Sequence, residues 1–446
     1  MCKFFMINKY NNRCVLWAFG VLFFIFSNAV SAQETPTSLY DCILQAVENN
    51  YSIKYTRNRE AIAENNITYA PFLPDLVANG RQSQTHSDSK QKYDTGTEVS
   101  ATNVRADNYN IGLSLNWRIF DGLAMFATHS RQKELLSVAQ QESEYAIENL
   151  IAKVCNEYYN IIVLENRLTA AEYSLSLSQE RYSQAMEMYT IGSSSGLDLR
   201  QAKIDLNADS SKLMRQGEEL RNAYIRLNTL MNAPFEQLGY VNDSINLLPK
   251  IDQTTLRERT MNFNSTLAAA RIGKRISEQE LKIARSTRFP TLDFTTGYNY
   301  SLAETPSASL TYNRSNGLNW GFSLSWTIFD GLETNRRIKN AKLEIKGSEL
   351  NYQQIENSIM SDLALLYNAY ENNLLMINFE TESAETAYQT LDAAMARYKV
   401  GALSGIEFRE YQRKYLDAVD RKFIALYQAK VSEINLRLMS GELVKE

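Results

Sequence analysis

The sequence WRIFDGL at residues 117–123 returns as WTIFDGL at residues 326–332, at an offset of 209. Directly before each copy, large apolar residues alternate with small or polar ones, in YNIGLSLN at 109–116 and LNWGFSLS at 318–325. A period of two places all the large side chains on one face of a β-strand. The chain therefore contains two copies of a unit in which a strand leads into an FDG turn.

Weaker alternation before each of these strands predicts a partner for it. We expect four strands per chain, near residues 74–86, 108–120, 290–303 and 317–329. Their apolar face would be core in a soluble sandwich and would face lipid in a transmembrane barrel, and periodicity alone does not separate the two. The strands are few, about ten residues long, and rich in Tyr and Trp near their ends, which favours the membrane. Residues 84–107 and 303–316 are then expected to be outer loops.

The segment after the first FDG turn is predicted to be one very long helix. Residues 123–189 contain neither Pro nor Gly, and 67 helical residues would make a rod of roughly 100 Å. Apolar residues recur every seven positions, which indicates coiled-coil packing. The main register contains Ile147, Val154, Ile161, Leu168, Leu175, Tyr182 and Tyr189, and an intermediate register contains Leu150, Leu164, Ala171 and Ala185.

A glycine-rich turn, IGSSSG at 191–196, ends this helix, and a returning helix runs to about residue 231. The turn also repeats at the offset of 209, because YTIG at 189–192 matches YKVG at 398–401. We assign residues 33–237 to a first structural repeat with its helical hairpin at 121–231. Residues 238–446 form a second repeat with its hairpin at 330–440.

Strand counting predicts an oligomer. One chain supplies four strands, whereas the smallest transmembrane barrels have eight. An open edge in lipid would leave backbone groups unpaired, so strands that span a membrane must come from at least two chains. A dimer would give eight strands and a trimer twelve.

The N-terminus has the three parts of a secretory signal peptide. Lys3, Lys9 and Arg13 precede an apolar run at residues 15–26, and VSA at 30–32 predicts removal of residues 1–32. The chain carries 47 Lys and Arg against 51 Asp and Glu, which argues against a nucleic-acid partner.

Two of the four cysteines, Cys2 and Cys14, would leave with the signal peptide. Cys42 and Cys155 remain, and a disulfide between them is possible in an exported protein. Their spacing does not show that they meet, and buried thiols are the favoured interpretation.

The order of these motifs resembles the TolC family of outer-membrane efflux proteins. The resemblance rests on LYDCILQAVENN at residues 39–50, on the two FDG turns and on the two hairpin turns. It implies a mainly α-helical protein with transmembrane β-strands, in which three chains share a 12-stranded barrel in the outer membrane. Their long antiparallel helical hairpins would form an α-barrel tunnel across the periplasm.

The same resemblance implies the function of a passive channel without enzyme activity or cofactor. Such a homotrimer serves a tripartite efflux or type I secretion system and is gated at its periplasmic tip. There it would meet a periplasmic adaptor protein and an inner-membrane pump. The expected adaptor-contacting residues are those of the two tip turns, Gly192, Gly196, Gly401, Leu403 and Gly405.

Family resemblance also indicates the gate residues. Glu407 and Glu410 correspond to acidic positions that narrow the pore, and threefold symmetry would bring them together as rings favouring cations. Glu407 has an equally weighted alternative, because SGIE at 404–407 is typical of a capping box. Asp198 and Tyr398 occupy latch positions. Leu403 stands where relatives can carry a basic residue, so the latch must differ in detail.

Two other functions compete with a channel. A periplasmic or surface coiled-coil scaffold without a pore would explain the long helices but not the strands flanked by Tyr and Trp. A hydrolase is disfavoured because the sequence contains no nucleophile–base or metal-ligand constellation, and His86 and His129 have no metal-binding spacing.

Overall fold

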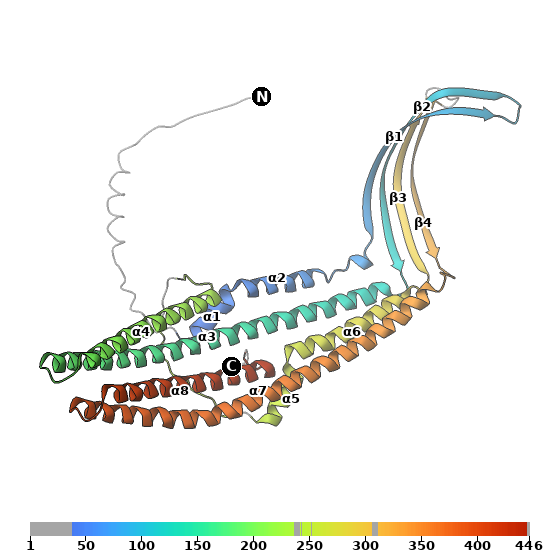
Figure 1. Cartoon of the computed structure of the whole chain (residues 1–446). Coiled ribbons are helices and arrows are strands. Elements are labelled where there is room, and N and C mark those ends of the chain that lie inside the picture. Colours follow the sequence, from blue (N-terminus) through green and yellow to red (C-terminus); the bar gives the residue numbers. More distant parts are fainter. Residues whose placement is uncertain (1–37, 236–240, 242, 251, 306–310, 444–446) are drawn as a thin grey trace, which may run out of the picture.

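The computed structural model describes residues 38–235, 241, 243–250, 252–305 and 311–443. The predicted signal peptide at residues 1–32 lies outside this part of the chain. Figure 1 shows a four-stranded sheet at one end of the molecule and long helices that extend from the foot of the sheet. Within the described ranges, none of the helices combines the length and the hydropathy needed to cross a bilayer.

The sheet is antiparallel throughout and has two open edges. Its spatial order is β1-β2-β3-β4, so that β1 and β4 form the edges. The strands are β1 (Asp75–Lys92), β2 (Glu98–Phe120), β3 (Thr291–Glu304) and β4 (Tyr312–Ser325).

Within the residues that the structure describes, no element packs over one face of this sheet. The side chains of Leu318, Trp320 and Leu324 on β4 are 68–71 % exposed, although they form the apolar face of the alternation. In a sandwich of two sheets this face would be buried. The uncovered face therefore removes the soluble-sandwich interpretation and requires an apolar environment outside the chain.

Three predictions about the strands are wrong in detail. Residues 84–107 form no loop, because β1 and β2 continue as a paired hairpin with only residues 93–97 between them. Small and polar residues fill this extension, so no apolar alternation marked it. Strand β4 ends at Ser325 and not near residue 329, because Ser325 pairs with Thr291, the first residue of β3. The other predicted loop, residues 303–316, is also too long, because β3 continues to Glu304 and β4 begins at Tyr312 and not near residue 317. Residues 306–310 lie outside the described residues.

The long helices occur as two pairs of matched length. Helices α3 and α7 have 67 residues each, and α4 and α8 have 36 each. They pack as two hairpins, and the hairpins meet where α3 contacts α8. The bounds are α3 (Ala124–Thr190), α4 (Gly196–Met231), α7 (Glu333–Lys399) and α8 (Gly405–Ser440).

Two of the four shorter helices, α2 and α6, complete the wall of helices near the sheet. Helix α2 packs on α3, α3 on α6 and α6 on α7, so that α2 and α7 are its outer members (Figure 1). Toward the turns the neighbours are α4, α3, α8 and α7. The short helices are α1 (Leu39–Asn49), α2 (Tyr51–Asn65), α5 (Gln253–Phe263) and α6 (Ser265–Ser286), and a single 3-10 turn at Ala70–Phe72 leads into β1.

The largest buried cluster joins α1 to the middle of α3. It contains Val154 and Ile161 of the predicted heptad register, both fully buried, together with Cys42 and Cys155. Both cysteines are free thiols, as the sequence favoured. Burial raises the pKa of each to about 11, so the thiols are protonated and weakly nucleophilic at neutral pH.

The segment between α4 and α5 is attached to α8 through buried charges. Lys430 and Glu433 form an ion pair of 3.0 Å within α8, and both side chains are buried. Lys430 also donates to the carbonyl oxygen of Asn246, and the backbone N–H of Leu248 donates to Glu433. The segment thereby satisfies charges that would otherwise be costly to bury.

Each junction between sheet and helices is held by a tryptophan from the apolar face. The indole Nε1 of Trp117 donates to the carbonyl oxygen of Phe72 at 3.0 Å, and that of Trp326 donates to the carbonyl oxygen of Arg288 at 3.1 Å. At the first junction, Gly122 has a φ of +71° and lies against the end of α6. A Cβ at Gly122 would overlap the carbonyl oxygen of Ser286, so only glycine fits this approach.

This contact predicts different effects for two matched substitutions. Gly122→Ala should destabilise the protein more than Gly331→Ala, the same position of the second repeat. Both residues have positive φ, which costs an alanine roughly 1–2 kcal/mol, but a Cβ at Gly331 meets nothing within 4 Å. Thermal unfolding of the two variants measures the difference, and equal losses would contradict a close approach at Gly122.

Candidate functional site

The two tip turns close the helical hairpins with the same backbone geometry. Gly192 and Gly401 adopt left-handed conformations, with φ of +74° and +73°. Backbone bonds then close each helix end, from Ser193 to the carbonyl of Met188 and from Ala402 to that of Arg397, both at 2.9 Å. The glycines are required because L side chains are strained at this φ.

Glu407 is engaged in the capping box that the sequence suggested. Its backbone N–H donates to Ser404 Oγ at 3.2 Å, and the N–H of Ser404 donates to Glu407 Oε2 at 3.0 Å. The bonds from the backbone and hydroxyl of Ser404 lower the pKa of the Glu407 carboxyl. The first turn departs from this pattern, because Ser195 makes no such cap and instead donates to Asp198 at 3.0 Å.

Glu410 has a more open position than its neighbours. Its side chain is 54 % exposed, and its ion pair with Lys414, one turn along α8, is long at 3.9 Å. Arg409, the preceding residue, points into the protein, as described below. The two side chains thus leave α8 on different faces, since successive residues are 100° apart around a helix.

The latch candidates Asp198 and Tyr398 line one cavity between the two turns. This cavity has a volume of about 220 Å³ and is also lined by Arg181 and Leu403. Tyr398 stacks on Phe408, with ring centroids 5.3 Å apart, and burial raises the pKa of its hydroxyl. The structure therefore brings the two residues to one place, with Arg181 beside them.

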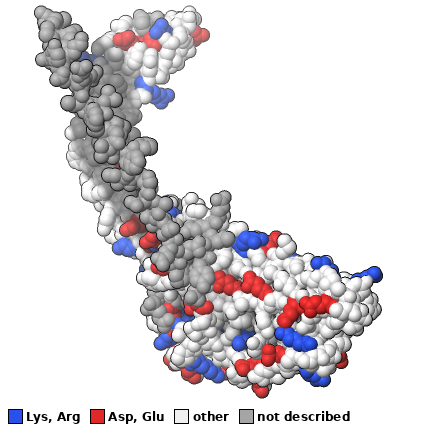
Figure 2. Space-filling view, turned by 90° about the vertical axis from the view of Figure 1, so that its left-hand side faces the viewer, with Lys and Arg blue, Asp and Glu red and all other residues white. Residues whose placement is uncertain are grey.

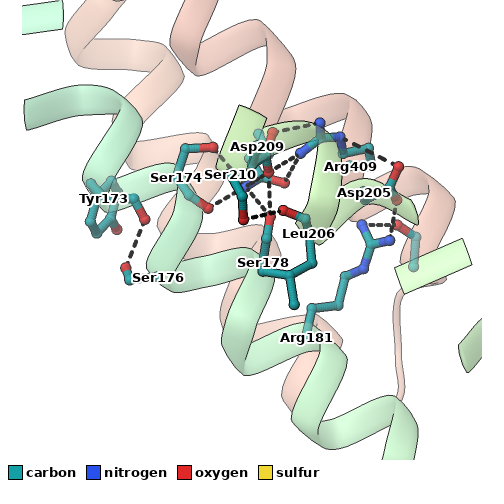
Figure 3. Close-up of polar contacts among 12 residues, drawn as sticks. Tyr173, Ser174, Ser176, Ser178, Arg181, Asp205, Leu206, Asp209, Ser210 and Arg409 are labelled. Carbon is teal, nitrogen blue, oxygen red and sulfur yellow. Dashed lines mark hydrogen bonds and ion pairs between the residues drawn. The ribbon is translucent and has the colours of Figure 1, made fainter. Parts of the chain in front are cut away.

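Next to this cavity lies a buried cluster of charges that joins the two hairpins (Figure 3). Arg409 of α8 donates to both carboxylate oxygens of Asp209 on α4, at 2.5 and 2.8 Å. Arg181 of α3 pairs with Asp205, one turn from Asp209, and also donates to the carbonyl oxygen of Gly405 at 3.3 Å. Two arginines and two aspartates from three helices are thus held together.

Uncharged groups satisfy the rest of this cluster. Ser178 Oγ donates to Asp209 at 2.5 Å. Gln412 of α8 is fully buried, and its Nε2 donates to the carbonyl and hydroxyl oxygens of Ser174 at 2.7 and 2.8 Å. We call Ser174, Ser178, Arg181, Asp205, Asp209, Arg409 and Gln412 the tip cluster.

Charge balance makes the tip cluster stable when it is complete. Asp209 is 4 % exposed and Arg181 is 3 % exposed, so neither charge is solvated. Burial alone would lower the pKa of Arg409, but the hydrogen bond and charges of Asp209 and Asp205 outweigh it and raise that pKa. With all four ionised groups present the cluster carries no net charge, and removing any one of them alone leaves a buried charge without its counterpart.

The sequence did indicate this site, but the signal was missed. The intermediate heptad register passes from Ala171 to Ala185 through Ser178, where a small polar residue interrupts an apolar seam. In the structure the seam near the turn contains Ser178 and Arg181, whereas Tyr189 of the predicted main register is 51 % exposed. A polar residue in a coiled-coil seam indicates a buried polar partner.

Charge elsewhere at this end of the molecule is mixed. Figure 2 looks at the end that carries the turns and shows Asp and Glu gathered in patches with Lys and Arg between them. Among the residues that the structure describes, no group of three or more His, Cys, Asp or Glu side chains could hold a metal ion.

Comparison with known proteins identifies relatives along nearly the whole chain. The family described as outer membrane efflux protein matches residues 43–233 and 256–442. Outer membrane protein TolC of Escherichia coli K12 is 21 % identical over 400 residues, covering 87 % of this chain and 79 % of that protein. Cation efflux system protein CusC of the same strain is 24 % identical over 411 residues, covering 90 % and 85 %.

The fold is also that of a solved channel. The structure of the CmeC outer membrane channel of Campylobacter jejuni superimposes with a TM-score of 0.78 at 16 % identity. The match covers 91 % of this chain and 85 % of that one.

The tip cluster predicts a strongly non-additive double-mutant cycle. Arg409→Met alone or Asp209→Leu alone should cost about 3–5 kcal/mol, because each leaves an uncompensated buried charge. The double variant should lose much less, because neither charge remains. Urea unfolding of the three variants, with hydrogen exchange of α4 and α8, measures the coupling. Additive losses would show that the two residues act independently.

The capping box predicts a pH dependence at the start of α8. A carboxyl with a lowered pKa stabilises the folded state above its ordinary pKa, and this contribution disappears as the pH falls through the lowered value. The protection of backbone amides in the first turn of α8, measured relative to their intrinsic exchange rate at each pH, should therefore fall in acid. In Ser404→Ala the onset should move to higher pH, since the Glu407 carboxylate loses the bond from the Ser404 hydroxyl and keeps only the one from the backbone N–H. An unchanged onset would contradict the box.

Proposed function

The chain belongs to the outer membrane efflux protein family, and we propose that it forms a passive homotrimeric conduit gated at its periplasmic turns. Family membership makes it an outer-membrane transport protein and not an enzyme. The proposal adds that the conduit works with a periplasmic adaptor protein and an inner-membrane pump, in tripartite efflux or type I secretion. The observation that carries the proposal is a four-stranded sheet with an uncovered apolar face and two open edges.

The open edges support closure by further copies. In lipid, the unpaired N–H and C=O groups of β1 and β4 would each cost several kcal/mol. Pairing of β4 with β1 of the next copy removes both edges, and three copies give twelve strands. The same pairing would extend β4 beyond Ser325, where β3 gives it no partner.

Exposed apolar side chains on the outer helices support the same ring of copies. Along α2, Tyr51, Tyr55 and Ile62 are 59–72 % exposed, and along α7, Leu343 and Leu350 are 67 % and 56 % exposed. Tyr55 and Ile62 are seven positions apart, and so are Leu343 and Leu350. This is the spacing of a coiled-coil seam. Because α2 and α7 are the outer members of the wall, these stripes would meet between copies.

The gate is proposed at the second turn, which carries Glu407 and Glu410. Threefold symmetry would bring the three Glu410 side chains near the axis, and like charges there favour cations. The tip cluster fastens α8 to the first hairpin, so it would hold these carboxylates in place. Asp198 and Tyr398, beside Arg181, would contribute to the same latch.

Exposed apolar side chains on the outer surface of the turns support the proposal that a partner protein binds there. Ile191 and Leu197 of the first turn are 77 % and 74 % exposed, and Val400 and Ile406 of the second are 77 % and 76 % exposed. These are the same positions in the two repeats, so three copies would present six similar apolar tips. We assign these four side chains to the surface that contacts the adaptor, together with Gly192, Gly196, Gly401, Leu403 and Gly405.

The trimer is tested by its size and its response to heat. The outer-membrane fraction should contain a complex of three chains that dissociates only on boiling, because loss of one chain from a closed barrel would leave open strand edges in lipid. Mass measurement of the solubilised complex checks the number. A soluble monomer in the periplasm would support a scaffold without a pore.

The gate is tested by matched neutral substitutions on one helix turn. Glu410→Gln should reduce the cation preference of single channels in planar bilayers, because it removes a charged ring. Glu407→Gln should have the smaller effect, because its carboxylate is held in the capping box. Unchanged conductance and ion preference in Glu410→Gln would exclude Glu410 from the constriction.

A further inference from the structure

A cavity lies at the junction between sheet and helices, far along α3 from the turns. It has a volume of about 330 Å³, and its lining residues come from the start of α3 and the end of α6. Figure 1 shows these two helix ends at the foot of the sheet. Leu123, Phe126 and Phe289 form its apolar walls, and Lys282 and Arg285 stand at its rim. The three apolar side chains are 54–58 % exposed, which is unusual for a group of large residues at one place.

Contacts place this cavity below the apolar face of the sheet. Trp117 belongs to that face and bonds through its indole to the carbonyl of Phe72. The Phe72 ring packs on Phe126, with centroids 5.1 Å apart, and Phe126 lines the cavity. On the other flank, Trp326 bonds to Arg288, which precedes the cavity residue Phe289. Both tryptophans thus mark the level at which the lipid-facing surface ends.

The rim cations differ from the other basic residues of α6. Lys274 and Arg275 are paired with Glu349 and Glu134, toward the middle of the helix. The side chains of Lys282 and Arg285 make no hydrogen bond or ion pair with any residue in the described ranges, and both are exposed. Two uncompensated positive charges therefore flank an apolar cavity at the edge of the bilayer.

We propose that this cavity binds an anionic phospholipid of the leaflet that faces the helices, one per protomer. The phosphate would lie between Lys282 and Arg285, and the first part of an acyl chain would cover Leu123 and Phe126. A cavity of this size holds a headgroup and not a whole lipid. The lipid would tie α6 to α3 where Gly122 already brings them together. The inference rests on the location of the chain in the outer membrane and does not depend on the proposed gate at the turns.

The test counts lipids on the purified channel by native mass spectrometry. Phosphatidylglycerol should be retained in preference to phosphatidylcholine. Lys282→Gln/Arg285→Gln should weaken its retention about 30-fold, because each basic side chain near an anionic headgroup contributes roughly fivefold. Arg200→Gln/Arg215→Gln, which removes the same charge from exposed positions of α4, away from the cavity, should retain the wild-type amount.

Further arms separate the source of the phosphate. Phe126→Ala should also weaken retention, whereas a large excess of inorganic phosphate should not displace the lipid. Wild-type protein without a preference for phosphatidylglycerol, or equal retention in the two double variants, would overturn the proposal. Displacement by phosphate would overturn it too, because it would show a site for the ion alone. Heat-modifiable migration of each sample reports whether the oligomer persists, so loss of assembly is distinguishable from loss of the lipid.

Discussion

The hydrogen-bonding requirement of the backbone at the two sheet edges is the constraint on which the rest of the structure depends. Within one chain, β1 and β4 each present a row of N–H and C=O groups without a strand beside them. Lipid supplies no partner for these groups. A single chain in lipid therefore leaves both edges unpaired, and its outer helices α2 and α7 also expose apolar side chains. In the proposed ring of copies, the same neighbours would close both the sheet and the helical wall.

The junctions carry this arrangement from sheet to helices. Trp117 and Trp326 donate to the carbonyl oxygens of Phe72 and Arg288, which lie just before β1 and β3. These bonds fix the position at which the chain passes from the sheet into α3 and into α7. From there α3 and α7 run for the same number of residues, and both turns lie at one end (Figure 1). Equal helix lengths are what make a flat tip possible, where residues of two repeats can meet.

Sequence patterns predicted those parts in which one chemical property repeats along the chain. Alternation identified β2 and β4, and the absence of Pro and Gly predicted the length of α3. The extension of β1 and β2 through residues 84–107 was missed, because backbone pairing there needs no apolar side chain. The pairing of Arg409 with Asp209 joins residues 200 positions apart, and only the serine that interrupts the α3 seam indicated it. Such pairing depends on which hairpin faces which, and local periodicity does not contain that information.

The two repeats differ where their hairpins meet, and this difference has a mechanical consequence. Arg409 of the second repeat corresponds to Arg200 of the first, which is exposed. The charge of Arg409 is instead balanced on the first hairpin, by Asp205 and Asp209. Moving α8 away from α4 would separate these charges, and removing one partner leaves the others unpaired in a buried place. A partly separated arrangement of α8 and α4 is then less favourable than one in which these charged side chains are fully paired or fully hydrated. A tip held in this way favours two arrangements over those between them, which is the property that the gate proposed above would need.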